Sequence, residues 1–235
     1  MSNWEQQQAE SVLRYMDSSY EADGTLGELF GAFIAVSVDR SGPVIDIGCG
    51  LHPLLPHYVK HLDLPKFIGI EPLTTVVERD YECLVGATAE NIPLSDNFAN
   101  AALFATSLDH IEDPVRAINE VKRVLKPEGR LYFWLGVHDP YILAEAKTFG
   151  VVHNHSRGLR KFLRIALAPF EHLHLVMAMK RRERDLRDGR SLDSAHLRYH
   201  TMATIDKEME SYGLRIVRRI LVPGSASAFV EAIPA

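Results

Sequence analysis

The stretch that decides the fold is Val44-Ile45-Asp46-Ile47-Gly48-Cys49-Gly50, an apolar run of β-forming residues that ends in two closely spaced glycines. Such a run predicts a buried strand, and glycines permit the positive φ values of a tight turn where a ligand can lie against bare backbone. Glu71 follows about 20 residues later, at the end of a second apolar run. A carboxylate there can accept hydrogen bonds from both hydroxyls of a ribose, so the two runs predict a site for a nucleoside-containing cofactor.

The glycine turn departs from the fingerprint of dinucleotide-binding proteins. That fingerprint has a third glycine, whereas residues 48–53 read GCGLHP and place Pro53 at that position. A cofactor without phosphate needs the close backbone approach but no free helix N-terminus for a dianion. The turn therefore favours a phosphate-free nucleoside over one that carries a pyrophosphate.

Apolar runs alternate with amphipathic stretches between residues 43 and 137. The runs are apolar on both faces, which is typical of parallel strands that are covered by helices on both sides. This alternation predicts right-handed crossovers and a doubly wound α/β fold. The expected strands lie at residues 44–47, 67–70, 81–85, 99–105 and 130–137.

The clearest helical pattern covers residues 114–125. We expect it to end at residues 126–129, where a lysine, a proline and a glycine follow one another. Its period predicts a single buried face. That face is expected to consist of Val115, Ile118, Val121 and Leu125.

The C-terminal residues predict the rest of the sheet. Residues 204–213 have a helical pattern, and residues 214–222 and 226–233 read as two strands joined by a short turn. A short joint favours an antiparallel pair. The expected fold is thus α/β, with a doubly wound, mostly parallel, Rossmann-like sheet of seven strands whose last strand is antiparallel.

Three parts are expected along the chain. Residues 41–137 and 201–235 would form the Rossmann-like cofactor domain, and residues 1–40 a helical N-terminal cap. Residues 138–200 are too long for a plain loop, so we expect an inserted helical lid that binds substrate. The mixed charges of residues 180–190 are typical of a solvated helix face.

Composition excludes several classes of protein. With 46% hydrophobic and 24% charged residues the chain is not of the disordered type, and no apolar stretch approaches the roughly 18 residues of a membrane span. The start lacks the pattern of a secretory signal, so we expect a cytoplasmic protein.

Cys49 and Cys83 are far apart in the sequence and form no CxxC motif; Cys49 is expected to be a small packing residue. The net charge of −5 argues against nucleic acid as a partner.

Five segments in order resemble the motifs of class I S-adenosylmethionine-dependent methyltransferases, in particular the methyltransferase type 11 group that acts on small molecules. They are VIDIGCG at 44–50, IEP at 70–72, AENIPL at 89–94, the run from Phe98 to Ile111, and LKPEGRL at 125–131. The resemblance covers residues 40–137 closely and the C-terminal part loosely. It implies S-adenosylmethionine as cofactor, S-adenosylhomocysteine as product, and methyl transfer as the reaction.

The resemblance also implies roles by position. The first motif would line the methionine part of the cofactor, Glu71 would bind the ribose hydroxyls, and later motifs would surround the adenine and the sulfonium. The implied cofactor-binding residues are Asp46, Gly48, Gly50, Glu71, Pro72, Leu73, Thr88, Ala89, Glu90, Thr106, Ser107 and Leu108.

Three residues are candidate bases for the acceptor. His110 follows the fourth expected strand, and His138 and Asp139 follow the fifth, where similar O-methyltransferases place a histidine and an acid. A base is needed only if the acceptor is a hydroxyl or a protonated amine. The alternatives are a structural loop histidine for His110 and a solvated loop residue for His138.

Two HxH pairs, His153-Asn154-His155 and His172-Leu173-His174, could each point to one face if they lay in strands. No third ligand follows at a recognised spacing, so no metal is predicted. The pairs fit an acceptor pocket in the lid better.

The favoured function is methyl transfer to a small-molecule acceptor, in particular a hydroxyl of a sugar or secondary metabolite. Leu51-His52 in the turn and Asn100, where the family usually has aspartate, favour instead a protein that binds the cofactor without transfer. A third alternative is a methyltransferase that acts on RNA or protein. The sequence leaves open whether the chain forms a homo-oligomer.

Overall fold

The fold is described from a computed structural model. It describes residues 24–73, 78–153 and 197–235. Between the last two ranges it describes only residues 169–170, 172–178, 180–181, 184–185 and 188. Among all of these, no helix is long and apolar enough to cross a membrane.

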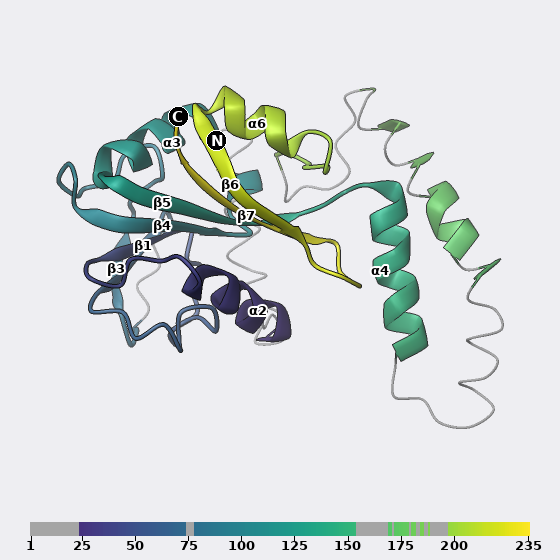
Figure 1. The fold of residues 1–235 in the computed structure, drawn as a ribbon, viewed down its shortest axis with the longest axis horizontal. Helices are drawn as coiled ribbons and strands as arrows, with labels where there is room; N and C mark the ends of the chain where they lie inside the picture. Colours follow the sequence, from purple (N-terminus) through teal and green to yellow (C-terminus); the bar gives the residue numbers. More distant parts are fainter. Residues whose placement is uncertain are drawn as a thin grey trace.

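A seven-stranded sheet in the order β3-β2-β1-β4-β5-β7-β6 forms the centre of the molecule (Figure 1). Strands β1 to β5 pair in parallel, while β7 is antiparallel to both β5 and β6. The predicted Rossmann-like sheet with an antiparallel last strand is confirmed. The strands are β1 (Val44–Ile47), β2 (Phe67–Glu71), β3 (Glu82–Val85), β4 (Ala99–Ala105), β5 (Leu125–Gly136), β6 (Leu214–Leu221) and β7 (Ser227–Pro234).

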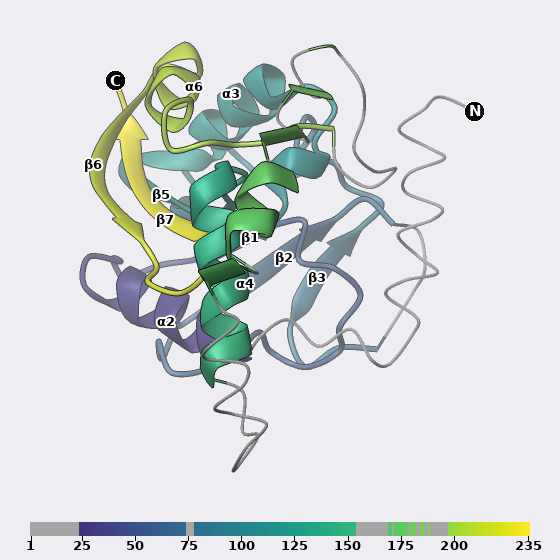
Figure 2. The same ribbon diagram turned by 90° about the vertical axis from the view of Figure 1, so that its right-hand side faces the viewer.

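Helices cover both faces of the sheet, as a doubly wound fold requires (Figures 1 and 2). Helix α2 (Gly24–Ala35) packs on one face, and α3 (Pro114–Val124) and α6 (Ile205–Ser211) pack on the other. Because side chains alternate along a strand, neighbouring strand residues enter different cores: Phe133 joins the α3 side and Trp134 the α2 side.

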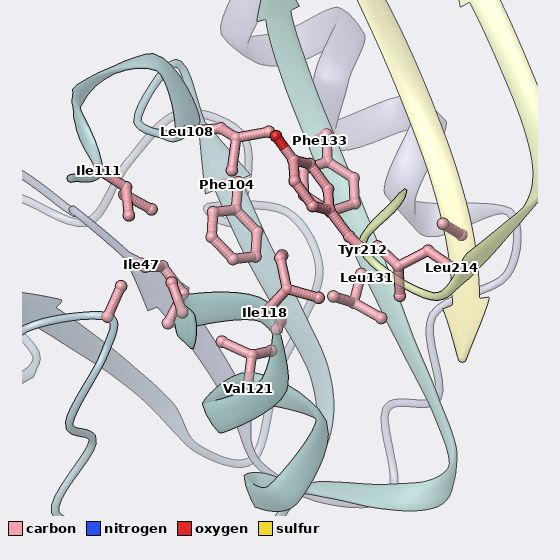
Figure 3. Packing of buried hydrophobic residues seen from close by; sticks show 14 of the residues in the cluster. Ile47, Phe104, Leu108, Ile111, Ile118, Val121, Leu131, Phe133, Tyr212 and Leu214 are labelled. Carbon is pink, nitrogen blue, oxygen red and sulfur yellow. The ribbon is translucent and has the colours of Figure 1, made fainter. Parts of the chain in front are cut away.

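The core on the α3 side is built around two aromatic rings from neighbouring strands. Phe104 and Phe133 stack with ring centroids 4.8 Å apart. Ile118 and Val121 of α3 belong to the same cluster, as does Tyr212 (Figure 3). Burial of these side chains fixes β4 and β5 beneath α3, which holds the carboxyl ends of the strands in place.

The expected helix face needs one correction. Val115 is 48% exposed, and the buried residues of α3 are Pro114, Ala117, Ile118, Val121 and Val124. Helical geometry rotates Val115 about 120° from Val121, which lies near the centre of the buried face. Pro114 and Val115 stand four and three residues before Ile118, and either spacing fits a helical period. The sequence pattern therefore could not decide which of the two is buried, and the choice of Val115 was wrong.

The fifth strand begins earlier than predicted. Helix α3 ends at Val124, and Leu125 is already extended, with φ −70° and ψ 142°. Leu125 pairs with Ala99, and pairing resumes between Arg130 and Ala101 after a register shift. The expected turn at residues 126–129 is therefore an irregularity within β5 instead of a separate connection.

Part of each expected helical region can be compared with the prediction. Helix α2 falls within the proposed cap, whereas residues 1–23 lie outside the described residues. In the proposed lid, α4 (Pro140–His153) follows β5, and residues 172–178 are helical. Both helical pieces lie beyond the end of β5 (Figures 1 and 2). Residues 154–168 and most of residues 179–196 lie outside the described part, and the domain boundaries stay a prediction.

Candidate functional site

A cleft opens at the carboxyl ends of β1, β2 and β4, where open α/β sheets bind their ligands. The space between its walls is about 690 Å³, which includes the part that opens to solvent. Its lining combines backbone of the glycine turn with two carboxylates, a histidine and small apolar side chains. The lining residues are Ile47, Gly48, Gly50, Ile70, Glu71, Pro72, Leu73, Thr88, Ala89, Glu90, Ala105, Thr106, Ser107, His110 and Ile111.

The glycine turn after β1 lies against the end of β4. Gly48 and Gly50 have φ values of +71° and +72°, the left-handed region that favours glycine. A Cβ on Gly48 would lie only 2.7 Å from the Cβ of Ser107. The Ser107 hydroxyl donates to the Ile47 carbonyl at 2.5 Å and so ties the two strand ends together. The turn therefore needs glycine for both its conformation and its packing.

Glu71 ends β2 and forms the polar floor of the cleft. Its carboxylate is almost fully buried and accepts hydrogen bonds from the Gly50 N–H at 2.6 Å and the Leu73 N–H at 3.0 Å. Burial raises the pKa of Glu71, and the two backbone donors act in the opposite direction. Each carboxylate oxygen keeps a further lone pair, so Glu71 can still accept hydroxyl groups from a ligand.

Asp46 lies in β1, fully buried, and does not line the cleft. The Tyr58 hydroxyl donates to its Oδ2 at 2.6 Å, while Oδ1 has no hydrogen-bond partner among the described residues. Burial raises the pKa of Asp46 to about 7, although the bond from Tyr58 lowers it. The residue thus places a weakly acidic group next to the glycine turn, and no sequence signal singled out Tyr58 as its partner.

The charges around the cleft suit a cation without phosphate. Glu71 and Glu90 line it, and its described lining contains no lysine or arginine. A pyrophosphate would meet like charge there, whereas a sulfonium or ammonium group would be attracted. The residues present therefore fit S-adenosylmethionine, whose adenosine carries no phosphate.

Among the three candidate bases, His110 is the one that lines the cleft. It ends the short helix η1 (Leu108–His110), and its side chain is 27% exposed. Its Nε2 lies 3.8 Å from Oδ1 of Asp109, and its backbone N–H donates to the Ser107 carbonyl at 3.0 Å. A partly exposed imidazole beside a carboxylate can accept a proton from a molecule in the cleft.

The loop that carries His110 is held by the segment that returns from the proposed lid. The Leu197 N–H donates to the Asp109 carbonyl at 2.9 Å, and the Arg198 guanidinium donates to the carbonyls of Ile111 and Glu112. These bonds fix η1 relative to the sheet, so the position of the imidazole depends on the end of the lid.

His138 and Asp139 lie outside the cleft lining. The His138 ring packs edge-on against Tyr199 with centroids 5.0 Å apart, and Oδ2 of Asp139 accepts the Met202 N–H at 2.8 Å. Both residues connect the point where the chain leaves β5 with the point where it returns. Leu108, expected under the sulfonium, is a buried core residue next to Ser107.

Two further sequence features have a structural explanation. Asn100 is buried at the beginning of β4, at the end of the strand away from the cleft, and donates to Asp39 at 2.6 Å and to Ser41 at 3.1 Å. The asparagine that departs from the family pattern therefore makes structural contacts away from the cleft. His172 and His174 lie in helical residues, so they do not share the face that a strand would give them.

The pair His153-Asn154-His155 cannot be compared in full. His153 ends α4, and residues 154 and 155 lie outside the described part of the chain. Within the described part, no three histidine, cysteine or acidic side chains gather as metal ligands. Several apolar lining residues were missed by sequence reasoning; they occupy or follow the ends of predicted strands, which is the signal that could have found them. They are Ile47, Ile70, Ala105 and Ile111.

Comparison with known proteins agrees with this geometry. Residues 45–133 match the family model described as a methyltransferase domain. The uncharacterized methyltransferase Rv3342 of Mycobacterium tuberculosis is 39% identical over 95 residues, which cover 37% of this chain and 37% of the relative. This alignment therefore spans well under half of the relative's length.

Solved structures share the fold at low sequence identity. The 1,6-didemethyltoxoflavin-N1-methyltransferase of Burkholderia thailandensis has a TM-score of 0.59 at 12% identity, covering 95% of this chain and 85% of its own. A SAM-dependent methyltransferase of Thermotoga maritima has a TM-score of 0.50 at 17% identity, covering 89% of each chain. Residues 45–133 thus match a methyltransferase domain, which confirms the methyltransferase resemblance seen in the sequence, and the solved structures show that the fold is shared with S-adenosylmethionine-dependent methyltransferases.

Proposed function

We propose that this chain transfers the methyl group of S-adenosylmethionine to a hydroxyl of a small-molecule acceptor, such as a sugar or a secondary metabolite. The observation that carries the proposal is that the glycine turn, the Glu71 carboxylate and the His110 imidazole surround one cleft. When bound there, the cofactor supplies an electrophilic methyl group on a positively charged sulfur.

In the proposal, each part of the cleft wall binds a different part of the cofactor. Glu71 would accept the ribose hydroxyls with the lone pairs that its backbone donors leave free. The bare backbone at Gly48 and Gly50 would lie along the methionine part, because no side chain stands between it and the ligand. Leu73 and Ala89, two buried apolar residues of the lining, would cover the adenine.

The acceptor half rests on His110. Methyl transfer from a sulfonium is an in-line displacement, so the protein mainly aligns the acceptor and excludes water. A hydroxyl acceptor must lose its proton as the oxygen–carbon bond forms, and the imidazole of His110 would take it. Asp109, with Oδ1 at 3.8 Å from Nε2, would stabilise the imidazolium that results.

Calorimetry with S-adenosylhomocysteine and a transfer assay with labelled S-adenosylmethionine test the proposal. The acceptor panel contains hydroxylated metabolites, amines, transfer RNA and a mixed protein sample. We expect binding of S-adenosylhomocysteine and labelling of a hydroxylated metabolite. Binding without any transfer would support the alternative of a non-catalytic cofactor-binding protein, and labelling of RNA or protein alone would replace the small-molecule acceptor.

Replacing His110 tests the base. His110→Gln should lower kcat about 10²–10⁴-fold, the usual contribution of a positioned base, with the affinity for S-adenosylhomocysteine unchanged. His61→Gln, which alters an exposed histidine outside the cleft lining, serves as the matched control. An unchanged kcat in His110→Gln would contradict the role of His110 while leaving the cofactor site intact.

A further inference from the structure

Cys49 and Cys83 are 34 residues apart in the chain, yet their sulfur atoms lie 3.6 Å apart. Cys49 is the middle residue of the glycine turn, and Cys83 lies in β3 at the edge of the sheet. Gly69 of β2 lies beside the pair, and a Cβ on it would be 2.4 Å from the Cys49 sulfur. The glycine therefore leaves the space that brings the two sulfurs into contact.

The surroundings of the two cysteines shift the pKa values of their thiols in opposite directions. The hydrogen bond between the two thiols lowers the pKa of Cys83, and the charge of Arg79 acts in the same direction. The same bond, together with burial, raises the pKa of Cys49. The Arg79 guanidinium lies 3.7 Å from the Cys49 sulfur and donates to the Tyr81 hydroxyl at 2.8 Å, which holds it over the pair. Cys83 is thus the more acidic of the two thiols, and both cysteines are half-buried.

We propose that Cys49 and Cys83 form a reversible disulfide on exposure to hydrogen peroxide, and that this disulfide weakens cofactor binding in the adjoining cleft. The disulfide itself follows from the contact between the sulfurs. Its effect on the ligand rests on the proposed function, since the ligand is S-adenosylmethionine or its product.

The chemistry takes two steps. The Cys83 thiolate donates an electron pair to one peroxide oxygen, the O–O bond breaks, and the departing hydroxide takes up a proton to leave as water. The sulfur of Cys49 then attacks the sulfenic sulfur of Cys83, the S–O bond breaks, and the thiol proton of Cys49 leaves with the hydroxide as a second water. Two thiols are oxidised to one disulfide, and one peroxide is reduced to two waters.

The new bond would displace the glycine turn. A disulfide holds its sulfurs about 2.05 Å apart, so the pair must close by about 1.5 Å. Cys83 is fixed by the pairing of β3 with β2, in which it lies opposite Gly69. Cys49 stands between Gly48 and Gly50, and Gly50 donates to Glu71. The movement therefore falls on the turn and disturbs the bond to the carboxylate expected to hold the ribose.

The first measurement follows the thiols alone, and it is unambiguous because the chain has two cysteines. Hydrogen peroxide is titrated into the reduced full-length chain, and free thiols, intact mass and cross-linked peptides are recorded. We expect both thiols to disappear together, with the loss of two hydrogens and a peptide that joins Cys49 to Cys83, all reversed by dithiothreitol. Sulfinic acid on one cysteine, or disulfides between chains only, would overturn the proposal.

The second measurement follows S-adenosylhomocysteine affinity by calorimetry in the reduced and oxidised protein. A coupling at the low end of the usual range predicts at least about fivefold weaker binding after oxidation. Cys83→Ser and Cys83→Ala, with thermal unfolding as a check of folding, should bind equally with and without peroxide. A wild-type disulfide that leaves the affinity unchanged would overturn the regulatory half of the proposal.

Failure of the proposed function has a different signature. If the reduced protein does not bind S-adenosylhomocysteine, that function fails, while thiol loss and peptide mapping still decide whether the disulfide forms. Linkage adds a check that involves both halves: in a thiol–disulfide redox buffer, saturating ligand should lower the equilibrium constant for disulfide formation by the same factor by which oxidation lowers the ligand's affinity.

Discussion

Glu71 and Glu231 are both buried, with 3% and 1% of their surface exposed, but the sheet treats them differently. Glu231 of β7 forms ion pairs with Arg130 through Oε1 and with Arg218, at 2.8 Å, through Oε2. Glu71 at the cleft accepts two backbone N–H groups, and no lysine or arginine of the described residues forms an ion pair with it. One carboxylate is balanced by two arginines within the fold, and the other is held by backbone donors at the cleft.

This difference distinguishes a carboxylate held in ion pairs from one that we propose binds a ligand. Arg130, Arg218 and Glu231 come from β5, β6 and β7, so their ion pairs join the three strands of the antiparallel half of the sheet. A similar arginine beside Glu71 would compete with a cationic ligand and occupy the carboxylate oxygens. The absence of an ion pair to Glu71 among the described residues therefore supports the proposed binding role of this carboxylate.

The largest effect is expected from Glu71→Gln. Two hydroxyl groups bonded to a charged carboxylate contribute about 1.5–3 kcal/mol each, so affinity for S-adenosylhomocysteine should fall at least about 100-fold. Calorimetry measures the loss, and the matched control is Glu231→Gln, which alters a buried glutamate in the other half of the sheet. Unchanged binding in Glu71→Gln would remove the physical basis of the cofactor site.

The second prediction concerns the control residue, whose replacement should change the stability of the protein and not its affinity for the ligand. Glu231→Gln should lower the free energy of unfolding by about 2–3 kcal/mol, below the usual value for a broken buried ion pair, because both arginines reach solvent. Urea denaturation measures the loss, and calorimetry on the same sample should show unchanged affinity for S-adenosylhomocysteine. A variant that loses affinity but not stability would show that the two glutamates are not separable in this way.

The smallest effect concerns Asp46, a third buried carboxylate. Its hydrogen-bond donor is the hydroxyl of Tyr58 instead of an arginine or a backbone N–H group. Because burial raises its pKa to about 7, the folded protein holds this proton more tightly than the unfolded chain. The resulting stability is complete below about pH 4 and is lost as the pH rises through about 7. Wild type should therefore lose about 2 kcal/mol relative to Asp46→Asn between about pH 5 and pH 8.

Urea denaturation of both proteins at the two pH values checks this prediction. Asparagine keeps an acceptor for the Tyr58 hydroxyl, which donates to Asp46 at 2.6 Å, so the comparison isolates the charge. Parallel pH dependence in wild type and variant would mean that Asp46 is ionised as easily in the folded protein as in the unfolded chain.

The sequence predicted the features that depend on local pattern. Apolar runs located the strands, and the glycine turn with Glu71 located the cleft, because strand ends of a parallel sheet must meet at one edge. The helix face was wrong at Val115, since period alone does not define where a face ends. Of the candidate bases, His110 lies at the cleft while His138 does not.

Contacts set by strand register could not be predicted in this way. Arg130 and Glu231 are 101 residues apart, and the two cysteines are 34 residues apart, yet each pair meets side by side. Glu231 stands within an apolar strand, where a lone acid gives no sign of its partners. Such pairs become visible only when the order β5-β7-β6 or β1-β2-β3 is known.

The chain segment that leaves the sheet after β5 returns to the place where it began. Val137 forms a bridge with His200, and the His138 N–H donates to the His200 carbonyl at 2.8 Å. An insertion whose two ends are neighbours can be shortened, lengthened or exchanged without moving β5 or α6. We propose that acceptor choice and cofactor use can diversify separately in this architecture, through grafted segments that keep Leu197 and Arg198 and with them the bonds to the His110 loop.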